Sequence, residues 1–353
     1  MNITRTLSLL AACALATACD GAPEPELDAE LSGTELRDGA GQGGPVFNTH
    51  LVNLTEVPSL DTLGNAINGV SLGGVEVVFN NNLEPILPGT LKVQNGTVEG
   101  VIDDGMGGSL TVSGFDFLKS VWHLDINGSP RDLQISEMEW GEFSGLHAPS
   151  DPTNILMLSP DRLVYSFRDL DSPRELHTCP ADEFGHRWTI LSGDVDVDED
   201  GDLYSIANRV YFACSKGAVG KSFVFGYGHD RPNAPFFDIP TQSTAIDMVR
   251  AAYCDDDRSW TITGEMIKIA DRDGHNEHGA NIQGFESEAL WEVGGRPVCV
   301  NQIRKNDNGL LAAPLNCGSL TDPDPIPLCG DESLDLFATY QDGYIWTRTP
   351  AYQ

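Results

Sequence analysis

Short alternating runs of apolar and polar residues recur between residues 46 and 150, separated by Gly- and Asn-rich turns. Alternation over about four to eight residues is typical of a strand with one buried face. The predicted strands here are Val75–Phe79, Thr90–Val93, Thr97–Ile102, Ser109–Val112, Val121–Ile126 and Leu133–Met138. Their number and spacing predict a small β-sandwich or barrel.

The strand pattern continues beyond residue 150, after the turn-rich segment HAPSDPTN (147–154). The strands predicted there are Arg162–Phe167, Trp188–Ile190 and Arg209–Ala213, with an alternating pair at Ile267 and Ile269 further on. Turn-forming residues between two patterned regions indicate a boundary. We therefore expect an N-terminal β domain at 46–150 and a C-terminal domain at 151–353.

One helical pattern interrupts the predicted strands. Apolar residues recur at helical spacing at Ile246, Val249 and Tyr253. The candidate N-caps are Thr241, Ser243 and Thr244. Three aspartates at 255–257 oppose the dipole at a helix C-terminus, so we expect the helix to end at Cys254. The chain is thus predicted to be mainly β, with a small N-terminal β-sandwich or barrel followed by a disulfide-stapled β-rich domain that has one central helix.

The first 19 residues resemble a bacterial lipoprotein signal peptide. Arg5 supplies a basic start, and the apolar run that follows is too short to span a bilayer. Two cleavage sites compete. LAAC, ending at Cys13, has the more usual letters, whereas ATAC, ending at Cys19, leaves an apolar run of normal length and precedes polar chain. We expect a signal peptide at 1–18 and a lipid on Cys19, with a plain secretory signal as the alternative.

Residues 19–45 are rich in Pro, Gly and acidic residues, which predicts an acidic flexible linker. The chain of 353 residues has 21 basic and 53 acidic residues and a net charge of −32. This charge argues against electrostatic binding to nucleic acid or to anionic lipid. From the signal peptide we expect an exported, lipid-anchored location in the bacterial cell envelope, with membrane contact through the anchor. From the charge we expect no nucleic-acid partner. The sequence leaves open which membrane holds the anchor.

Six of the eight cysteines lie beyond the expected lipid site, namely Cys179, Cys214, Cys254, Cys299, Cys317 and Cys329. This even number favours lipidation at Cys19, because cleavage at Cys13 would leave Cys19 as a stray thiol. No two are spaced as in a C-x-x-C metal or redox motif. In an oxidising compartment they predict three disulfides, for which fifteen pairings are possible. We predict Cys179–Cys214, Cys254–Cys299 and Cys317–Cys329.

Three motifs resemble known catalytic or binding signatures without meeting their requirements. GVSLG (69–73) matches a nucleophile elbow, but a strand follows where a helix is needed. KGAVGKS (216–222) has two residues between its glycines where a phosphate loop has four. GHNEHG (274–279) spaces its histidines three apart, not four apart as on a metalloprotease helix. We therefore expect no nucleophile elbow, no phosphate loop and no zinc site at these three motifs.

The acidic run GDVDVDEDGDLY (193–204) is the strongest candidate for a metal site. Asp196, Asp198 and Asp200 stand where a calcium loop has its first, third and fifth positions. The twelfth position, which should be Glu, is Ala207, so Asp202 or another carboxylate would have to complete the shell. The interpretation that the sequence favours is an exposed hairpin tip without a cofactor, and the alternative is a weak calcium site.

The segment RAAYC (250–254), with the residues that follow to 274, resembles the signature of the ADYC-domain family. YFACSKGAVGKSFVFGYG (211–228) and FESEALWEVGGRPVCV (285–300) resemble the family's flanking segments. PVFNTH (45–50) and SVWHL (120–124) are more faintly similar to its N-terminal region. The resemblance implies an export route, often with a lipid anchor in Gram-negative bacteria, and a fold; the family's function is uncharacterised.

The chain departs from the family pattern at three positions. Ala252 stands where the family has its namesake Asp, so any chemistry of that carboxylate would be lost. Ser222 and Ala245 stand where members tend to have cysteines. The absence of both cysteines would be explained if they form one disulfide in other family members, which this protein then lacks.

Two functions remain open from the sequence. The first is a non-catalytic interaction or structural module of the envelope, with a protein or glycan partner that the sequence does not identify and no catalytic residue set. The second is an envelope hydrolase acting on glycan or peptide through Asp255, Asp256 or Asp271 together with His275. A cleft with a carboxylate pair at the separation found in glycosidases would favour the second, and a flat surface or an apolar groove would favour the first.

Overall fold

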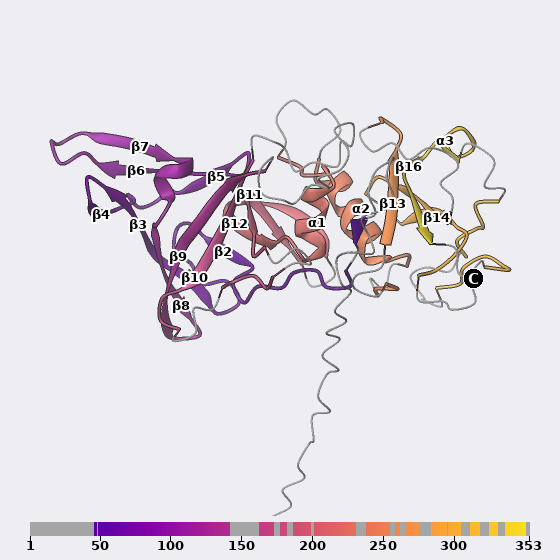
Figure 1. The fold of residues 1–353 in the computed structure, drawn as a ribbon, viewed down its shortest axis with the longest axis horizontal. Coiled ribbons are helices and arrows are strands. Elements are labelled where there is room, and N and C mark those ends of the chain that lie inside the picture. Colours follow the sequence, from indigo (N-terminus) through magenta and orange to yellow (C-terminus); the bar gives the residue numbers. More distant parts are fainter. Residues whose placement is uncertain are drawn as a thin grey trace, which may run out of the picture. The chain divides into compact units, whose positions relative to one another are not determined.

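Three antiparallel sheets and three α-helices make up the part of the chain that the computed structural model describes (Figure 1). The described residues are 46–47, 49–141, 162–172, 177–181, 186–198, 201–230, 238–254, 258–261, 266–274, 284–294, 296–304, 311–317, 325–330 and 336–350. The mainly β prediction is confirmed.

The largest sheet has eight strands in the order β2 (Ser59–Asp61), β12 (Leu203–Cys214), β11 (Thr189–Val197), β10 (Leu163–Asp169), β9 (Ser129–Trp140), β8 (Val121–Ile126), β3 (Val70–Phe79) and β4 (Asn82–Pro85). The expected boundary near residue 150 lies outside the described residues. Strands on either side of it, β9 and β10, are neighbours in this sheet, with Leu163 opposite Trp140. The described residues form one compact unit. The sheet thus joins segments that the sequence pattern assigned to separate domains.

A three-stranded sheet covers one face of the large sheet. Its order is β5 (Lys92–Gln94), β6 (Thr97–Asp103) and β7 (Ser109–Ser113), and the 3-10 turn η1 (Gly114–Phe117) follows. Between the two sheets lies a core that includes Trp122, packed edge-on against Phe167 and Phe212. Gly193 lets the sheets approach, because a Cβ there would collide with the Val93 carbonyl oxygen. The predicted sandwich is therefore present, but it uses strands from both halves of the chain.

The third sheet has five strands in the order β1 (Val46–Phe47), β13 (Met266–Asp271), β16 (Gly343–Pro350), β14 (Phe285–Glu292) and β15 (Pro297–Val300). The short helix α3 (Leu336–Thr339) precedes β16. Helix α1 (Ala218–Val224) contacts β11 and β12 of the large sheet, and helix α2 (Ile239–Arg250) contacts β12 and also β14. One apolar core therefore runs from the large sheet through the two helices to the five-stranded sheet.

Helix α2 is the predicted central helix, but it begins and ends earlier than expected. Its N-cap is Asp238, whose carboxylate accepts a hydrogen bond from the Thr241 backbone N–H at 2.9 Å. Pro240 fits the first turn, where its missing N–H costs nothing. The helix ends at Arg250 because Ala251 adopts a left-handed conformation with φ 54°. Tyr253 and Cys254 therefore follow the helix instead of forming its last turn.

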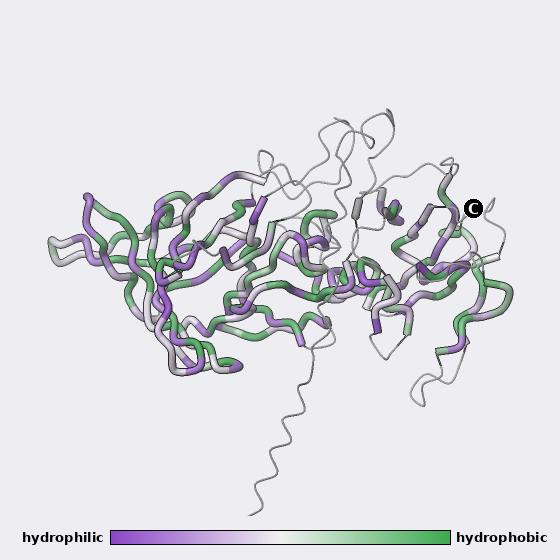
Figure 2. The backbone as a smooth tube through the Cα atoms, turned by 60° about the horizontal axis from the view of Figure 1, so that its bottom comes forward, coloured by the Kyte–Doolittle hydropathy of each residue, from purple (hydrophilic) through white to green (hydrophobic). Residues whose placement is uncertain are grey.

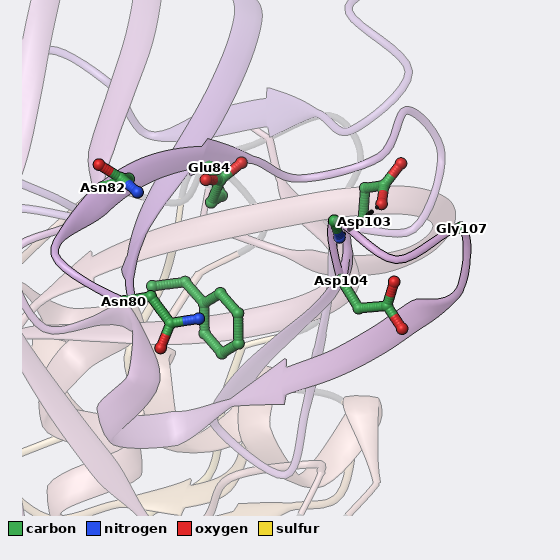
Figure 3. A pocket seen from close by; sticks show the side chains of 8 residues that line it. Asn80, Asn82, Glu84, Asp103, Asp104 and Gly107 are labelled. Atoms are coloured by element: carbon green, nitrogen blue, oxygen red, sulfur yellow. Dashed lines mark hydrogen bonds between the residues drawn. The ribbon is translucent and has the colours of Figure 1, made fainter.

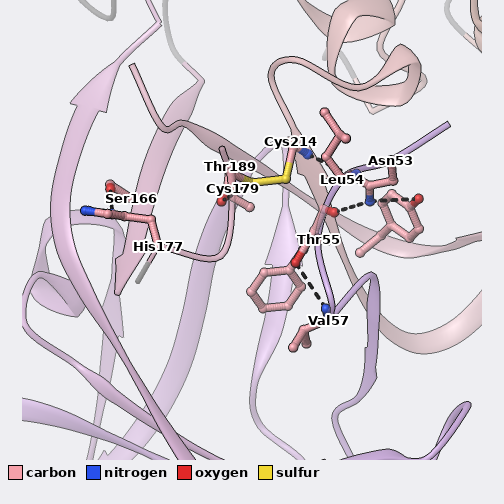
Figure 4. The surroundings of a disulfide bond; sticks show 11 residues. Asn53, Leu54, Thr55, Val57, Ser166, His177, Cys179, Thr189 and Cys214 are labelled. Atoms are coloured by element: carbon pink, nitrogen blue, oxygen red, sulfur yellow. Dashed lines mark hydrogen bonds between the residues drawn. A yellow bond between two sulfur atoms is a disulfide. The ribbon is translucent and has the colours of Figure 1, made fainter. Parts of the chain in front are cut away.

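The first of the three disulfides, Cys179–Cys214, was predicted correctly. It ties the segment before β11 to the last residue of β12 (Figure 4). Asn53 lies beside it, donating to the Phe212 carbonyl at 2.6 Å and accepting from the Cys214 N–H at 3.1 Å. An early segment of the chain is thereby bonded to the end of β12.

The other two predicted pairings were wrong. The structure joins Cys254 to Cys317 and Cys299 to Cys329. Alternation along β15 explains the exchange: Val300 faces the core under the helices, whereas Cys299 faces a small cluster on the other side of the sheet. Cys254 belongs to the core under the helices, so the sheet separates it from Cys299. Loop length alone could not show which face each cysteine occupies.

Polar residues interrupt the apolar ones throughout the described chain (Figure 2). Among the described residues, no helix has the length and apolar character needed to cross a membrane.

Candidate functional site

A pocket of about 510 Å³ lies between the tip of the β3–β4 hairpin and the turn that joins β6 to β7 (Figure 3). Its lining residues are Phe79, Asn80, Asn82, Glu84, Asp103, Asp104, Gly105 and Gly107. None of them is basic. The pocket therefore combines one aromatic ring with amide and carboxylate groups.

Strand pairing places the hairpin residues of the pocket on one face. Phe79 lies opposite Asn82, and Val77 lies opposite Glu84. Residues two apart on a strand share a face, so Phe79 continues the inward row of Val77. Asn80 and Asn81 form the two-residue turn, with φ of 49° and 65°. Asn tolerates this left-handed conformation, which the tight hairpin turn requires.

Two aspartates build the opposite wall. Asp103 Oδ1 accepts from the Gly105 N–H at 2.8 Å. Asp104 Oδ1 accepts from the N–H groups of Met106 and Gly108, each at 2.8 Å. These bonds, that of Met106 first, hold the pKa of Asp104 below its ordinary value. The loop thus presents a fully charged carboxylate at neutral pH.

Three polar side chains of the pocket have no hydrogen-bond partner within the described residues. They are Asn80, Asn82 and Glu84. The Phe79 ring is half-buried and packs against the edge of the sandwich core. Such groups can hold a polar ligand with one apolar face. The sequence pattern did not indicate this site, because residues 79–84 and 103–107 belong to different sheets and come together only in the folded chain.

The expected calcium ligands are only partly described. Asp196 is buried, its carboxylate 3.1 Å from Ser59 Oγ and 3.5 Å from Arg209 Nε. Asp198 Oδ1 accepts from the N–H groups of Gly201 and Asp202. Asp200 lies outside the described residues, and those described contain no group of three or more His, Cys, Asp or Glu placed to hold a metal. Calcium binding stays a prediction, which a thermal-shift titration of wild type against Asp198→Asn tests.

The carboxylates of the hydrolase alternative are also only partly described. Asp255, Asp256 and His275 lie outside the described residues, as does Cys19. Asp271 is buried in β13, and Tyr227 donates to its Oδ2 at 3.1 Å. Ser71 of the rejected elbow motif lies inside β3, opposite Asp125. The described structure therefore brings none of these residues together.

His229 forms a relay of polar groups that the sequence did not indicate. Its Nδ1 lies 2.6 Å from Gln242 Oε1, and its Nε2 lies 3.5 Å from Ser192 Oγ. A hydrogen bond from Nδ1 to Gln242 would leave Nε2 as an acceptor toward the serine. Ser192 is, however, completely buried, so its hydroxyl is not presented to a substrate in this structure.

The RAAYC segment forms a buried polar centre. The Tyr253 hydroxyl donates to Glu288 Oε1 at 2.6 Å, and Arg304 Nη2 donates to Glu288 Oε2 at 3.0 Å. Trp291 stacks on Tyr253 with ring centroids 5.5 Å apart. Burial, together with the Glu288 charge, raises the pKa of Tyr253 well above its ordinary value. Tyr253 therefore stays neutral and serves as a donor to the carboxylate.

One comparison with known proteins gives a match, and the matched part of the chain includes the RAAYC segment. A family model described as the ADYC domain matches residues 114–306, which include α1, α2 and the buried centre but not the pocket at 79–107. No curated protein and no solved structure was found to match the chain. Because the family model covers more than half of its 353 residues, the chain belongs to the ADYC domain family.

Proposed function

We propose that the protein is an exported lipoprotein of the bacterial cell envelope, anchored through a lipid on Cys19. Its folded body is a non-catalytic interaction module that binds a protein or glycan partner. Membrane contact runs through the anchor, and the net charge of −32 opposes direct attraction to anionic lipid or nucleic acid.

The pairing of the cysteines is the observation that carries the proposal. All six cysteines beyond Cys19 form three disulfides, so neither Cys13 nor Cys19 is needed to pair any of them. Disulfides of this kind form and persist in oxidising compartments outside the cytosol. The pairing therefore supports export, and it leaves a cysteine at the end of the signal-like segment to receive a lipid.

The interaction role draws support from the pocket in Figure 3 and from the place of the expected hydrolase residues. The pocket offers polar groups without protein partners among the described residues. Asp271, the one hydrolase candidate that is described, is buried beneath Tyr227. We keep a hydrolase acting on glycan or peptide as the alternative.

Intact-mass analysis of the membrane fraction tests the anchor. We expect a mature chain of 335 residues (353 minus 18) that begins at Cys19 and carries diacylglycerol. Cys19→Ala should abolish the lipid-bearing form, whereas the matched control Cys13→Ala should leave it intact. A mature chain that starts at another residue, or that has no lipid, contradicts the proposal. Release of sugar or peptide fragments from purified envelope by the protein would favour the hydrolase.

A further inference from the structure

We propose that the pocket between the β3–β4 hairpin and the β6–β7 turn binds a neutral or amino-bearing pyranoside of a surface glycan. This inference rests on the proposed interaction role and names the class of its ligand. The Phe79 ring is the stacking platform, and the surrounding amide and carboxylate groups bind the sugar hydroxyls.

The Phe79 ring is available as a stacking platform because it lies at the edge of the sandwich core. The inward row of β3 runs Val75, Val77, Phe79, and the first two are buried in the core between the sheets. Phe79 is half-buried, since it packs against that core on one side and lines the pocket on the other. A pyranose has an apolar face of C–H groups, which buries favourably against an aromatic ring.

The polar groups match the rim of a sugar ring. A hydroxyl both donates and accepts, and so does the amide of Asn80 or Asn82, while Glu84 accepts. None of these three side chains has a hydrogen-bond partner within the described residues, so a ligand need not break protein contacts to reach them. Burying a sugar hydroxyl in a pocket costs little free energy only where the pocket supplies hydrogen-bond partners for it.

Charge narrows the class of sugar. Glu84, Asp103 and Asp104 face the pocket, and no lining residue is basic. An acidic sugar or a phosphate bound in the pocket would be repelled by the carboxylates that line it. A neutral sugar is accepted, and a sugar amine is attracted. A metal ion is a poorer fit, because no three acidic or histidine side chains of the described chain converge on one point.

Saturation-transfer NMR and calorimetry on the mature, full-length protein test the inference with three probes. They are the N-acetylglucosamine tetramer, its de-N-acetylated amino form and tetragalacturonate. We expect binding of the first two and none of the acidic tetramer. Phe79→Ala should raise the dissociation constant for the neutral tetramer by about tenfold or more, because the platform is lost.

Two matched controls separate the pocket from general damage. Phe115→Ala removes a ring that is 43% exposed and does not line the pocket, and Glu137→Gln neutralises an exposed carboxylate on β9. Both should bind the neutral tetramer like wild type. If Phe79→Ala fails to fold, Asn82→Ala and Glu84→Gln decide instead, because these positions carry no core packing.

The outcomes also separate this inference from the proposed function. No binding of either favoured probe, binding that all pocket variants retain, or equal binding of tetragalacturonate each overturns the sugar assignment. If the lipid is still found on Cys19 in that case, the anchored module stands and only its ligand is wrong. Sugar binding by a chain without lipid would overturn the anchor while leaving the pocket assigned.

Discussion

Glu288 and Arg304 are charged residues whose side chains expose none of their surface to solvent. Arg304 Nε lies 2.8 Å from Glu288 Oε1, and its Nη1 donates to the Val249 carbonyl at 3.0 Å. Each charge is expensive to bury alone and tolerable only with its partner. The pair links β14 to the C-terminal turn of α2, so a substitution of either partner should destabilise both elements.

Removing the carboxylate leaves the Arg304 charge buried without its partner. We expect Glu288→Ala to lower the free energy of unfolding by about 3–5 kcal/mol. Tyr253→Phe, which removes one hydrogen bond to the same carboxylate, should cost about 1.5–3 kcal/mol. Urea denaturation measures both. The exposed Glu137→Ala is the control, and an equal loss in that variant would contradict a special role for the buried pair.

His123 is a second charged centre, on the outer face of the large sheet. Its Nδ1 lies 2.7 Å from Asp132 Oδ1, and its Nε2 lies 3.5 Å from Glu76 Oε2. Burial by itself lowers the pKa of His123, but the hydrogen bonds and charges of Asp132 and Glu76 outweigh it and raise the pKa above its ordinary value. The folded protein therefore binds the proton more tightly than the unfolded chain.

The raised pKa gives this centre a defined pH dependence. Its stabilisation is complete below the ordinary histidine pKa and is lost as the pH rises through the folded value. We expect His123→Gln to lose about 0.2–1 kcal/mol at about pH 5.5, the range of exposed ion pairs, and almost nothing at about pH 8.5. Denaturant midpoints at the two pH values measure the difference. A larger loss at the higher pH would show that the charged form is not the stabilising one.

At the scale of single elements, the local pattern of apolar and polar residues predicted several strands and the central helix. Strand β8 has the bounds that alternation indicated, and β6 and β7 differ by one residue each. Helix α2 was found from its apolar spacing, but its start was missed because Asp238 lies before Pro240. The pocket was missed for a different reason. It depends on which hairpins meet across the sandwich, and short-range pattern holds no information on such pairing.

The cap of α2 gives a test at this scale. Asp238→Ala removes the acceptor for the Thr241 N–H and should lower the free energy of unfolding by about 1 kcal/mol. Asp238→Ser can accept the same bond and should restore most of the loss. Thermal or urea unfolding compares the three proteins. Equal stability of the Ala and Ser variants would mean that this hydrogen bond does not stabilise the helix.

Across the whole molecule, contacts between distant segments decide the fold. The large sheet pairs β2 with β12, far apart in the chain, and β1 pairs with β13. The sequence predicted the class of fold and the number of bridges, since both follow from composition and period. It could not predict the pairing of Cys254, because that depends on the face of β15 occupied by Cys299.

Thiol mapping distinguishes the observed pairing from the one expected from sequence. Cys254→Ser should leave Cys317 as the free thiol, whereas the predicted pairing would have freed Cys299. Loss of this bridge should cost about 2–5 kcal/mol. Alkylation of the oxidised variant followed by peptide mass spectrometry identifies the thiol. Wild type should show none among residues 179–329, and a labelled Cys299 in the variant would contradict the structure.

The two bridges of the C-terminal region interleave, because Cys299 falls inside the loop closed by Cys254 and Cys317 and its partner Cys329 falls outside. A chain that enters an oxidising compartment from its N-terminus presents Cys254 and Cys299 before Cys317 arrives. An oxidant that joins cysteines in order of arrival would therefore make a wrong bond. The native pairs then require thiol–disulfide exchange. The rate of maturation should accordingly depend on a disulfide isomerase, and not on the supply of oxidant alone.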